Sequence, residues 1–132
     1  MVVDTSAVLA ILQDEPERRH LNEAIEAADS RVMSVATFVE ASIVIESRFG
    51  AEGLYHLDQL VDRAGVVLAP VDVEQAHVAR AAFSRFGKGR HPASLNYGDC
   101  FSYALAQVLG ELLLFKGDDF SLTDVRSVPA VD

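Results

Sequence analysis

The sequence lacks the features that would assign it to several large classes of proteins. No apolar run approaches the roughly 18 residues that a membrane-spanning helix needs, and the start Met1-Val2-Val3-Asp4 has no basic segment typical of a secretory signal. The single cysteine, Cys100, excludes an internal disulfide and a cysteine zinc site. The four histidines have no paired ligand spacing. These absences predict a soluble cytoplasmic protein with no membrane partner.

Acidic residues are missing from one long stretch, although the chain as a whole is acidic. The net charge is −9, which argues against general nucleic-acid binding. Between Gln75 and Gly98, however, there is no acid, and the cations there are Arg80, Arg85, Lys88 and Arg90. This stretch could hold phosphates as a local basic patch, or it could be a solvated basic loop.

Short apolar segments alternate with helical patterns along all 132 residues, without repeats or linkers, and predict one domain over residues 1–132. Strands are expected at 2–4, 31–34, 66–70, 111–115 and 125–128. Helices are expected at 7–12, 21–28, 37–48, 52–64, 73–86 and 97–109, the last capped by Asn96. This rhythm favours an α/β fold in which helices cover both faces of a parallel sheet. Such folds bind ligands at the carboxyl ends of their strands.

Four acidic positions lie beside core-forming residues, where an uncompensated carboxylate costs several kcal/mol to bury. They are Asp4, Glu40, Asp99 and the pair Asp118-Asp119. Together they suggest one pocket for a divalent cation, and oxygen ligands of this kind suit Mg²⁺ or Mn²⁺.

Each acid also has an ordinary structural explanation to be weighed. Asp4 could cap the helix that follows it, and Asp99 could complete a capping arrangement with Asn96. Glu40 is harder to explain this way, because its neighbours at helical spacing are mostly apolar. Asp118 and Asp119 are adjacent, so only one of the two is expected to enter a pocket.

The motifs around these acids resemble the PIN-domain ribonucleases, and more closely the VapC toxins of bacterial VapBC toxin–antitoxin modules. The resemblance covers nearly the whole chain, in order. It is carried by Glu40 within a helix and by Met1-Val2-Val3-Asp4-Thr5-Ser6-Ala7, Asn96-Tyr97-Gly98-Asp99-Cys100 and Phe115-Lys116-Gly117-Asp118-Asp119-Phe120.

The resemblance implies a PIN-like three-layer α/β/α sandwich with a mostly parallel, five-stranded sheet. It implies catalytic acids at Asp4, Glu40, Asp99 and Asp119. Asp4 and Asp99 would be ligands of Mg²⁺, for which Mn²⁺ would substitute. Glu40 and Asp119 could share in this, Asp118 less so, because the family pattern favours Asp119. Four carboxylates permit either one or two metal ions.

The resemblance also implies a Mg²⁺-dependent endoribonuclease that a VapB-like antitoxin neutralises, acting as a homodimer and in toxin–antitoxin hetero-oligomers. The helix pair at 36–49 and 52–64 could form a groove for the antitoxin, although such apolar residues are more often core. Thr5 or Ser6 would hold the first acid or a metal-bound water. For the RNA backbone we infer contacts from the cations Arg85, Lys88, Arg90 and Lys116.

The alternatives to this interpretation are two phosphotransfer folds and a PIN-like module without catalytic activity. Phosphotransfer folds of the haloacid dehalogenase type need a second aspartate two residues after the first, where this chain has Ser6. Receiver domains need an adjacent acid pair near the first strand, which is missing here. A PIN-like module that binds RNA or protein without cleaving it stays open as the alternative. The sequence does not indicate which RNA would be cleaved.

Overall fold

The computed structural model describes residues 1–129, and its elements follow the alternation expected from the sequence. Within that range the strands are β1 (Val2–Val3), β2 (Val32–Ser34), β3 (Val67–Ala69) and β4 (Leu113–Leu114). The helices are α1 (Thr5–Leu12), α2 (Arg18–Ala27), α3 (Val35–Arg63), α4 (Val73–Phe86) and α5 (Tyr97–Leu109), with a short 3-10 helix, η1 (Phe120–Leu122). No helix among these residues is long and apolar enough to cross a membrane.

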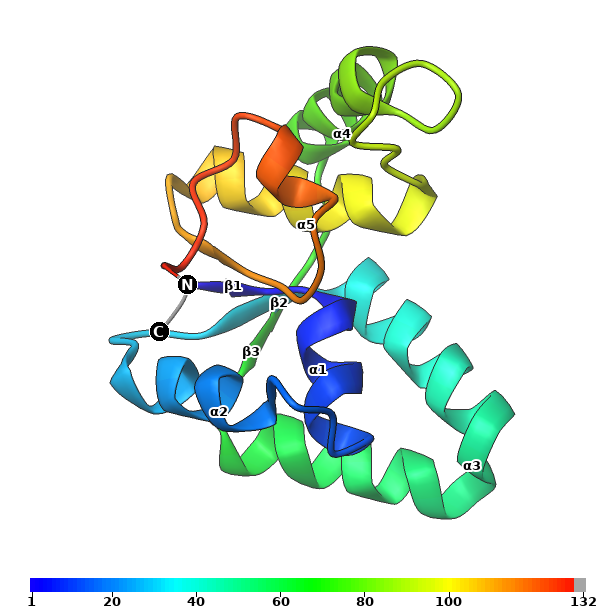
Figure 1. Ribbon diagram of the computed structural model, residues 1–132, viewed down its shortest axis with the longest axis vertical. Coiled ribbons are helices and arrows are strands. Elements are labelled where there is room, and N and C mark those ends of the chain that lie inside the picture. The colour runs from blue at the N-terminus through cyan, green and yellow to red at the C-terminus, as the bar shows by residue number, and fades with distance from the viewer. Residues whose placement is uncertain (130–132) are drawn as a thin grey trace.

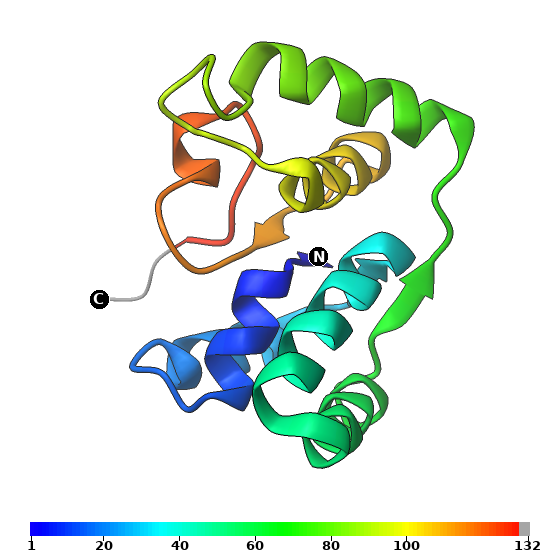
Figure 2. The ribbon, with the colours of Figure 1, turned by 90° about the vertical axis from the view of Figure 1, so that its right-hand side faces the viewer.

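The strands form one parallel sheet in the order β3-β2-β1-β4, so that β1 lies inside the sheet. Helices α1, α2 and α3 cover one face, and α4 and α5 cover the other (Figures 1 and 2). This arrangement confirms the predicted three-layer α/β fold. Because every strand runs in the same direction, the segments that leave the strands emerge along one edge of the sheet.

The core has two parts, one on each face of the sheet. Successive strand side chains point to opposite faces, so Val2 and Leu113 pack under α4 and α5, whereas Val3 and Leu114 pack against the layer of α1, α2 and α3. All four side chains are almost completely buried. The two residues of β1 therefore join both halves of the core.

The expectation of five strands was wrong for the described residues, which contain four. The segment predicted as a strand at 125–128 makes a single parallel bridge, between Leu113 and Ser127. Leu113 donates to the carbonyl of Arg126 (2.8 Å) and accepts from the amide of Val128 (3.0 Å). Because β4 has only two residues and Pro129 follows, no second bridge extends this contact into a strand.

Helix ends follow local capping chemistry. Asp72 caps α4 by accepting a hydrogen bond from the amide of Gln75 (2.8 Å), and Gly110 ends α5, as expected. The two helices expected at 37–48 and 52–64 form one element, α3, which bends at Gly50. The backbone of Gly50 is not helical there (φ 67°, ψ −155°), so the bend divides α3 into two halves.

Candidate active site

The four predicted acids lie where strands end and helices begin. Asp4 follows β1 and is the N-cap of α1. Glu40 lies near the start of α3, and Asp99 lies in the first turn of α5. Asp119 follows β4 and precedes η1. The starts of α1, α3 and α5 meet at one edge of the sheet (Figure 2), as the side-chain contacts below require.

Asp4 is held by hydroxyl groups from two elements. It is 2% exposed, and its Oδ1 accepts a hydrogen bond from the Ser102 hydroxyl (2.5 Å). Its Oδ2 accepts from the hydroxyl (2.7 Å) and the amide (3.0 Å) of Ser6. Ser102 is itself hydrogen-bonded to the Thr37 hydroxyl (3.1 Å). Thus the capping role considered for Asp4 is real, and its carboxylate is also oriented by α5.

Glu40 lies between α1 and the start of α5. The Thr5 hydroxyl donates a hydrogen bond to Glu40 Oε1 (2.6 Å). The Glu40 carboxylate also rests against the backbone of Gly98, so closely that a Cβ at position 98 would lie 1.8 Å from Oε2. Only glycine admits this contact, which explains the glycine that directly precedes Asp99.

Asp99 takes part in the predicted capping arrangement, and its pKa is shifted. Asn96 Oδ1 accepts from the Asp99 amide (2.9 Å), and Asp99 Oδ2 accepts from the Asn96 amide (3.0 Å), a complete capping box. Burial raises the pKa of Asp99 from 3.8 to about 6; the Asn96 amide lowers it, and repulsion from Asp4, Glu40 and Asp119 raises it. The acids that act on Asp99 therefore include Asp119, and Asp118 is not among them.

No protein cation neutralises this group within the described residues. The ion pairs found among residues 1–129 involve other carboxylates. Nor do any three His, Cys, Asp or Glu side chains in that range form a ready-made metal cluster. Mg²⁺ usually keeps several waters and takes one or two carboxylates directly. The uncompensated, oxygen-only donor set therefore fits a hydrated divalent cation in its chemistry and charge.

Lys116 occupies a different place from the one expected of an RNA-binding cation. Its side chain is paired with Glu15 and lies 3.7 Å from Glu17, in the turn between α1 and α2. Its backbone amide donates to the Ser6 hydroxyl (3.0 Å), which in turn donates to Asp4. Lys116 thus ties the loop that carries Asp119 to the start of α1.

The other predicted cations lie on α4 and the loop after it. Arg85 pairs with Asp124 (3.2 Å), Arg90 lies over the Phe83 ring (5.8 Å), and Lys88 is exposed in the loop. None of them is among the groups that shift the pKa of Asp99. The structure therefore brings Thr5 and Ser6 to the acids, but not these three cations.

Ser102 and Thr37 were missed by the sequence interpretation. Both are almost fully buried and link α3, α5 and the Asp4 carboxylate. The only sequence signal was that each is a small hydroxyl residue within an apolar helical segment. Ser102 also lies one helical turn after Gly98. Such residues are too common in helices to indicate a site on their own.

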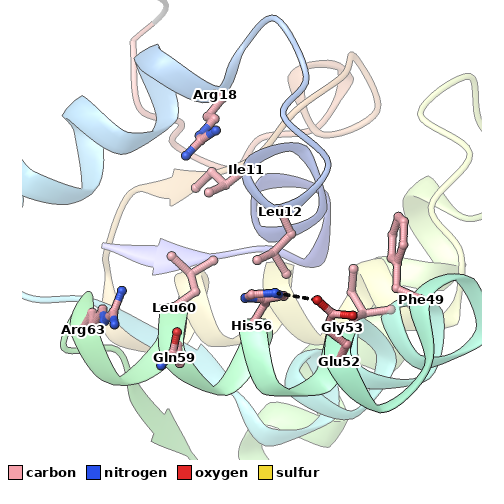
Figure 3. Close-up of a pocket in the computed structure, with 11 residues that line it drawn as sticks. Ile11, Leu12, Arg18, Phe49, Glu52, Gly53, His56, Gln59, Leu60 and Arg63 are labelled. Atoms are coloured by element: carbon pink, nitrogen blue, oxygen red, sulfur yellow. Dashed lines mark ion pairs between the residues drawn. The ribbon is translucent and has the colours of Figure 1, made fainter.

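A separate groove of about 610 Å³ lies between α1 and the two halves of α3 (Figure 3). Leu12, Phe49 and Leu60 form part of its apolar wall, and Arg18 and Arg63 stand at its edges. Within it, His56 lies 3.7 Å from Glu52. The bend at Gly50 shapes this groove, because residues from both halves of α3 line it.

Comparisons with known proteins agree on one family. The family model of the PIN domain matches residues 1–125. Ribonuclease VapC of Mycolicibacterium smegmatis is 57% identical over 128 residues, covering 97% of this chain and 99% of that protein. Ribonuclease VapC30 of Mycobacterium tuberculosis is 52% identical, covering 97% of this chain and 98% of that protein.

Solved structures share the fold at low sequence identity. VapC20 of Mycobacterium tuberculosis, described as a sarcin-ricin loop cleaving toxin, superposes with a TM-score of 0.78 at 15% identity, covering 96% of this chain and 97% of that one. The VapBC2 complex of Rickettsia felis, bound to promoter DNA, gives a TM-score of 0.73 at 11% identity, covering 96% of each chain.

Proposed function

This chain belongs to the VapC family of PIN-domain proteins, and from that premise we propose that it is a Mg²⁺-dependent endoribonuclease toxin neutralised by a VapB-like antitoxin. The membership confirms the resemblance of the sequence motifs. The observation that carries the proposal is the gathering of acids at the start of α5, where Asp4 is bonded to Ser102 and Glu40 lies against Gly98 beside Asp99, with no ion-pair partner for them among residues 1–129.

The residues divide into groups that bind the cation and groups that orient them. Asp4 and Asp99 would hold Mg²⁺, which when bound polarises a phosphate oxygen and lowers the pKa of a bound water. Ser6 and Ser102 fix the two oxygens of Asp4, and Thr5 fixes Glu40. These contacts leave the carboxylates preorganised before RNA binds.

Glu40 and Asp119 orient the attacking water and accept its proton. The water oxygen attacks phosphorus, the bond from phosphorus to O3′ breaks in line with it, and the leaving O3′ takes a proton from solvent. The products are a 5′-phosphate and a 3′-hydroxyl. The acidic pocket is negatively charged and would repel a phosphodiester, so the substrate can bind there only when a cation is present.

RNA cleavage by the purified protein tests the proposal. We expect cleavage that requires Mg²⁺ or Mn²⁺ and falls more than about 100-fold in Asp4→Asn and Asp99→Asn. Asp119→Asn should fall similarly, whereas Asp118→Asn, its immediate neighbour, is the matched control and should cleave as the parent does. A Mg²⁺-induced rise in melting temperature, lost in Asp99→Asn, reports binding without reference to activity. Equal cleavage by the parent, Asp4→Asn and Asp99→Asn would refute the site.

The groove between α1 and α3 is the proposed antitoxin site. An amphipathic helix that lays its apolar side against Leu12, Phe49 and Leu60 would use a common mode of recognition. Phe49→Glu should cleave RNA normally but escape neutralisation by the antitoxin. Tyr55→Glu changes an exposed aromatic residue of the same helix that does not line the groove, and it should remain neutralised. If both variants are neutralised equally, the antitoxin binds elsewhere.

A homodimer is proposed through the outer side of α3. Val35, Val39 and Ile43 recur every fourth residue and are exposed, Ile43 by 61%. An exposed apolar stripe of this kind indicates a protein contact. Sedimentation should show a dimer that Ile43→Lys converts to a monomer.

A further inference from the structure

A second apolar cleft, of about 400 Å³, opens between α4 and α5. It shares no lining residue with the groove between α1 and α3, and none of the four acids lines it. Its walls come from the two helices that cover one face of the sheet. The lining residues are Ala76, Ala79, Arg80 and Phe83 of α4 and Tyr97, Cys100 and Phe101 of α5.

Tyr97 presents an aromatic ring to solvent beside the acidic site. It is 79% exposed, and it is the first residue of α5, two positions before Asp99. The ring of Tyr97 makes an edge-to-face contact with the ring of Phe101, and the two centroids are 4.9 Å apart. This contact fixes the orientation of Tyr97.

Arg80 adds a positive charge to the same cleft. It has no carboxylate within 4 Å among residues 1–129, and the whole segment from Gln75 to Gly98 contains no acid. An aromatic surface beside an unneutralised arginine is the combination that binds single-stranded nucleic acid, because bases stack on the ring and phosphates pair with the cation.

We propose that the cleft between α4 and α5 is a nucleobase subsite, in which Tyr97 stacks on one unpaired base of the RNA and Arg80 contacts a neighbouring phosphate. The proposal rests on the RNA cleavage proposed above. Two residues along a helix differ by about 200° in direction, so Tyr97 and Asp99 lie on opposite sides of one turn. A helix is only about 10 Å wide, so one RNA strand can reach both.

The charge of the cleft favours RNA over a second copy of this chain. A two-fold contact through this cleft would bring the same patch of both copies together. Arg80 would then face the corresponding arginine in a segment that holds no acid to separate them. The phosphates of RNA supply the missing negative charge.

The chain has only three tyrosines, which allows a direct test with fluorotyrosine and fluorine NMR. They are Tyr55, Tyr97 and Tyr103, and Tyr97→Phe assigns the resonance of interest. Adding single-stranded oligoadenylate should shift the Tyr97 resonance and leave exposed Tyr55 unchanged. An abasic ribose-phosphate strand of equal length carries the same charge but no bases, and it should not shift Tyr97.

Affinity for the same two strands completes the test. Tyr97→Ala should weaken oligoadenylate binding by about 5- to 100-fold, the range for one stacked base, whereas Tyr97→Phe and the control Tyr55→Ala should bind as the parent does. The abasic strand should bind equally to the parent and Tyr97→Ala. Arg80→Gln should reduce the salt dependence of binding by about one phosphate contact.

Several outcomes would overturn the proposal. Tyr97→Ala could weaken both strands equally, or neither. It could also convert a dimer to monomers without changing oligoadenylate affinity, which would make the cleft a contact between copies. A parent that cleaves RNA but shows no response at Tyr97 refutes the cleft alone. A parent that neither binds nor cleaves RNA refutes the ribonuclease proposal as well.

Discussion

Hydroxyl side chains hold two of the four acids in position independently of any cation. Ser6 and Ser102 donate to Asp4, and Thr5 donates to Glu40. A hydrogen bond to a charged group contributes about 1.5–3 kcal/mol, which offsets part of the cost of burying these carboxylates. Asp99 accepts a hydrogen bond within its capping box instead. Burial and the repulsion from the other acids still raise its pKa.

The pKa of Asp99 predicts how cation binding depends on pH. At about 6 it lies above the ordinary value of 3.8 expected in the unfolded chain. The folded protein therefore binds more protons than the unfolded chain between these values, and the contribution of Asp99 to stability falls as pH rises through that window. Mg²⁺ favours the ionised carboxylate, so it should raise the melting temperature more at about pH 7.5 than at about pH 5.

Calorimetry with and without Mg²⁺ at both pH values measures this effect. The Asp99→Asn variant is the control, because it has no carboxylate to titrate at this position. In that variant the difference between the two pH values should shrink. An equal Mg²⁺-induced shift at both pH values in the parent would show that Asp99 does not bind the ion.

Gly98→Ala should separate activity from stability. The new methyl group would meet Glu40 Oε2 at 1.8 Å and displace the carboxylate from the Thr5 hydroxyl. Alanine is also the better helix former, by up to about 1 kcal/mol. We expect RNA cleavage to fall at least about tenfold while the melting temperature changes little. In a Glu40→Gln background the same substitution should have almost no further effect on cleavage, and an additional large loss would point to a different cause.

At the scale of elements, the helices with local end signals were predictable and the weak strand was not. Helix α4 and helix α5 span the expected ranges, 73–86 and 97–109, and Asn96 caps α5 as predicted, because such end signals act within a few residues. The segment at 125–128 depends instead on a two-residue partner, β4, so its pattern did not reveal that a single bridge would form. The 3-10 helix η1 had no signal at all.

The same difference applies to the site. The order and local motifs of the acids predicted that they would gather, and Asp4, Glu40 and Asp119 are the acids that raise the pKa of Asp99. The partners of these acids could not be identified, because the contact from Ser102 to Asp4 joins residues 98 positions apart. The pairing of Lys116 with Glu15 could not be predicted either, because these residues are also far apart in the sequence.

The bend in α3 gives a prediction at this scale. Gly50 has φ 67° and ψ −155°, a region essentially closed to other residues, so Gly50→Ala should cost about 1–3 kcal/mol. The melting temperature should fall by about 3–10 °C, and antitoxin affinity should fall because both halves of α3 line the groove. Calorimetry and antitoxin titration measure the two effects. Ala51→Ser, one residue along the same bend, is the control, and a similar loss there would mean that the effect is not specific to the glycine.

For the whole molecule, the two halves of the core should unfold together. Leu105 belongs to the half under α4 and α5, and Leu57 to the half under α1, α2 and α3. Both are almost fully buried, so substitution by alanine should cost about 2–5 kcal/mol in either case. Because β1 contributes to both halves, urea transitions followed by helical circular dichroism and by the buried Tyr103 should coincide for the parent and for both variants. Separate midpoints would show that the halves are independent.

The shortness of β1 has a consequence for how this gene can change. Val2 faces one half of the core, Val3 faces the other, and Asp4 follows at once. Inserting or deleting a single codon between Val3 and Asp4 would either move the valines to the opposite faces of the sheet or rotate Asp4 away from Ser102. Loops elsewhere can absorb changes of length, but Asp4 alone joins β1 to α1, so an in-frame insertion here should disrupt either the core packing of β1 or the acidic site.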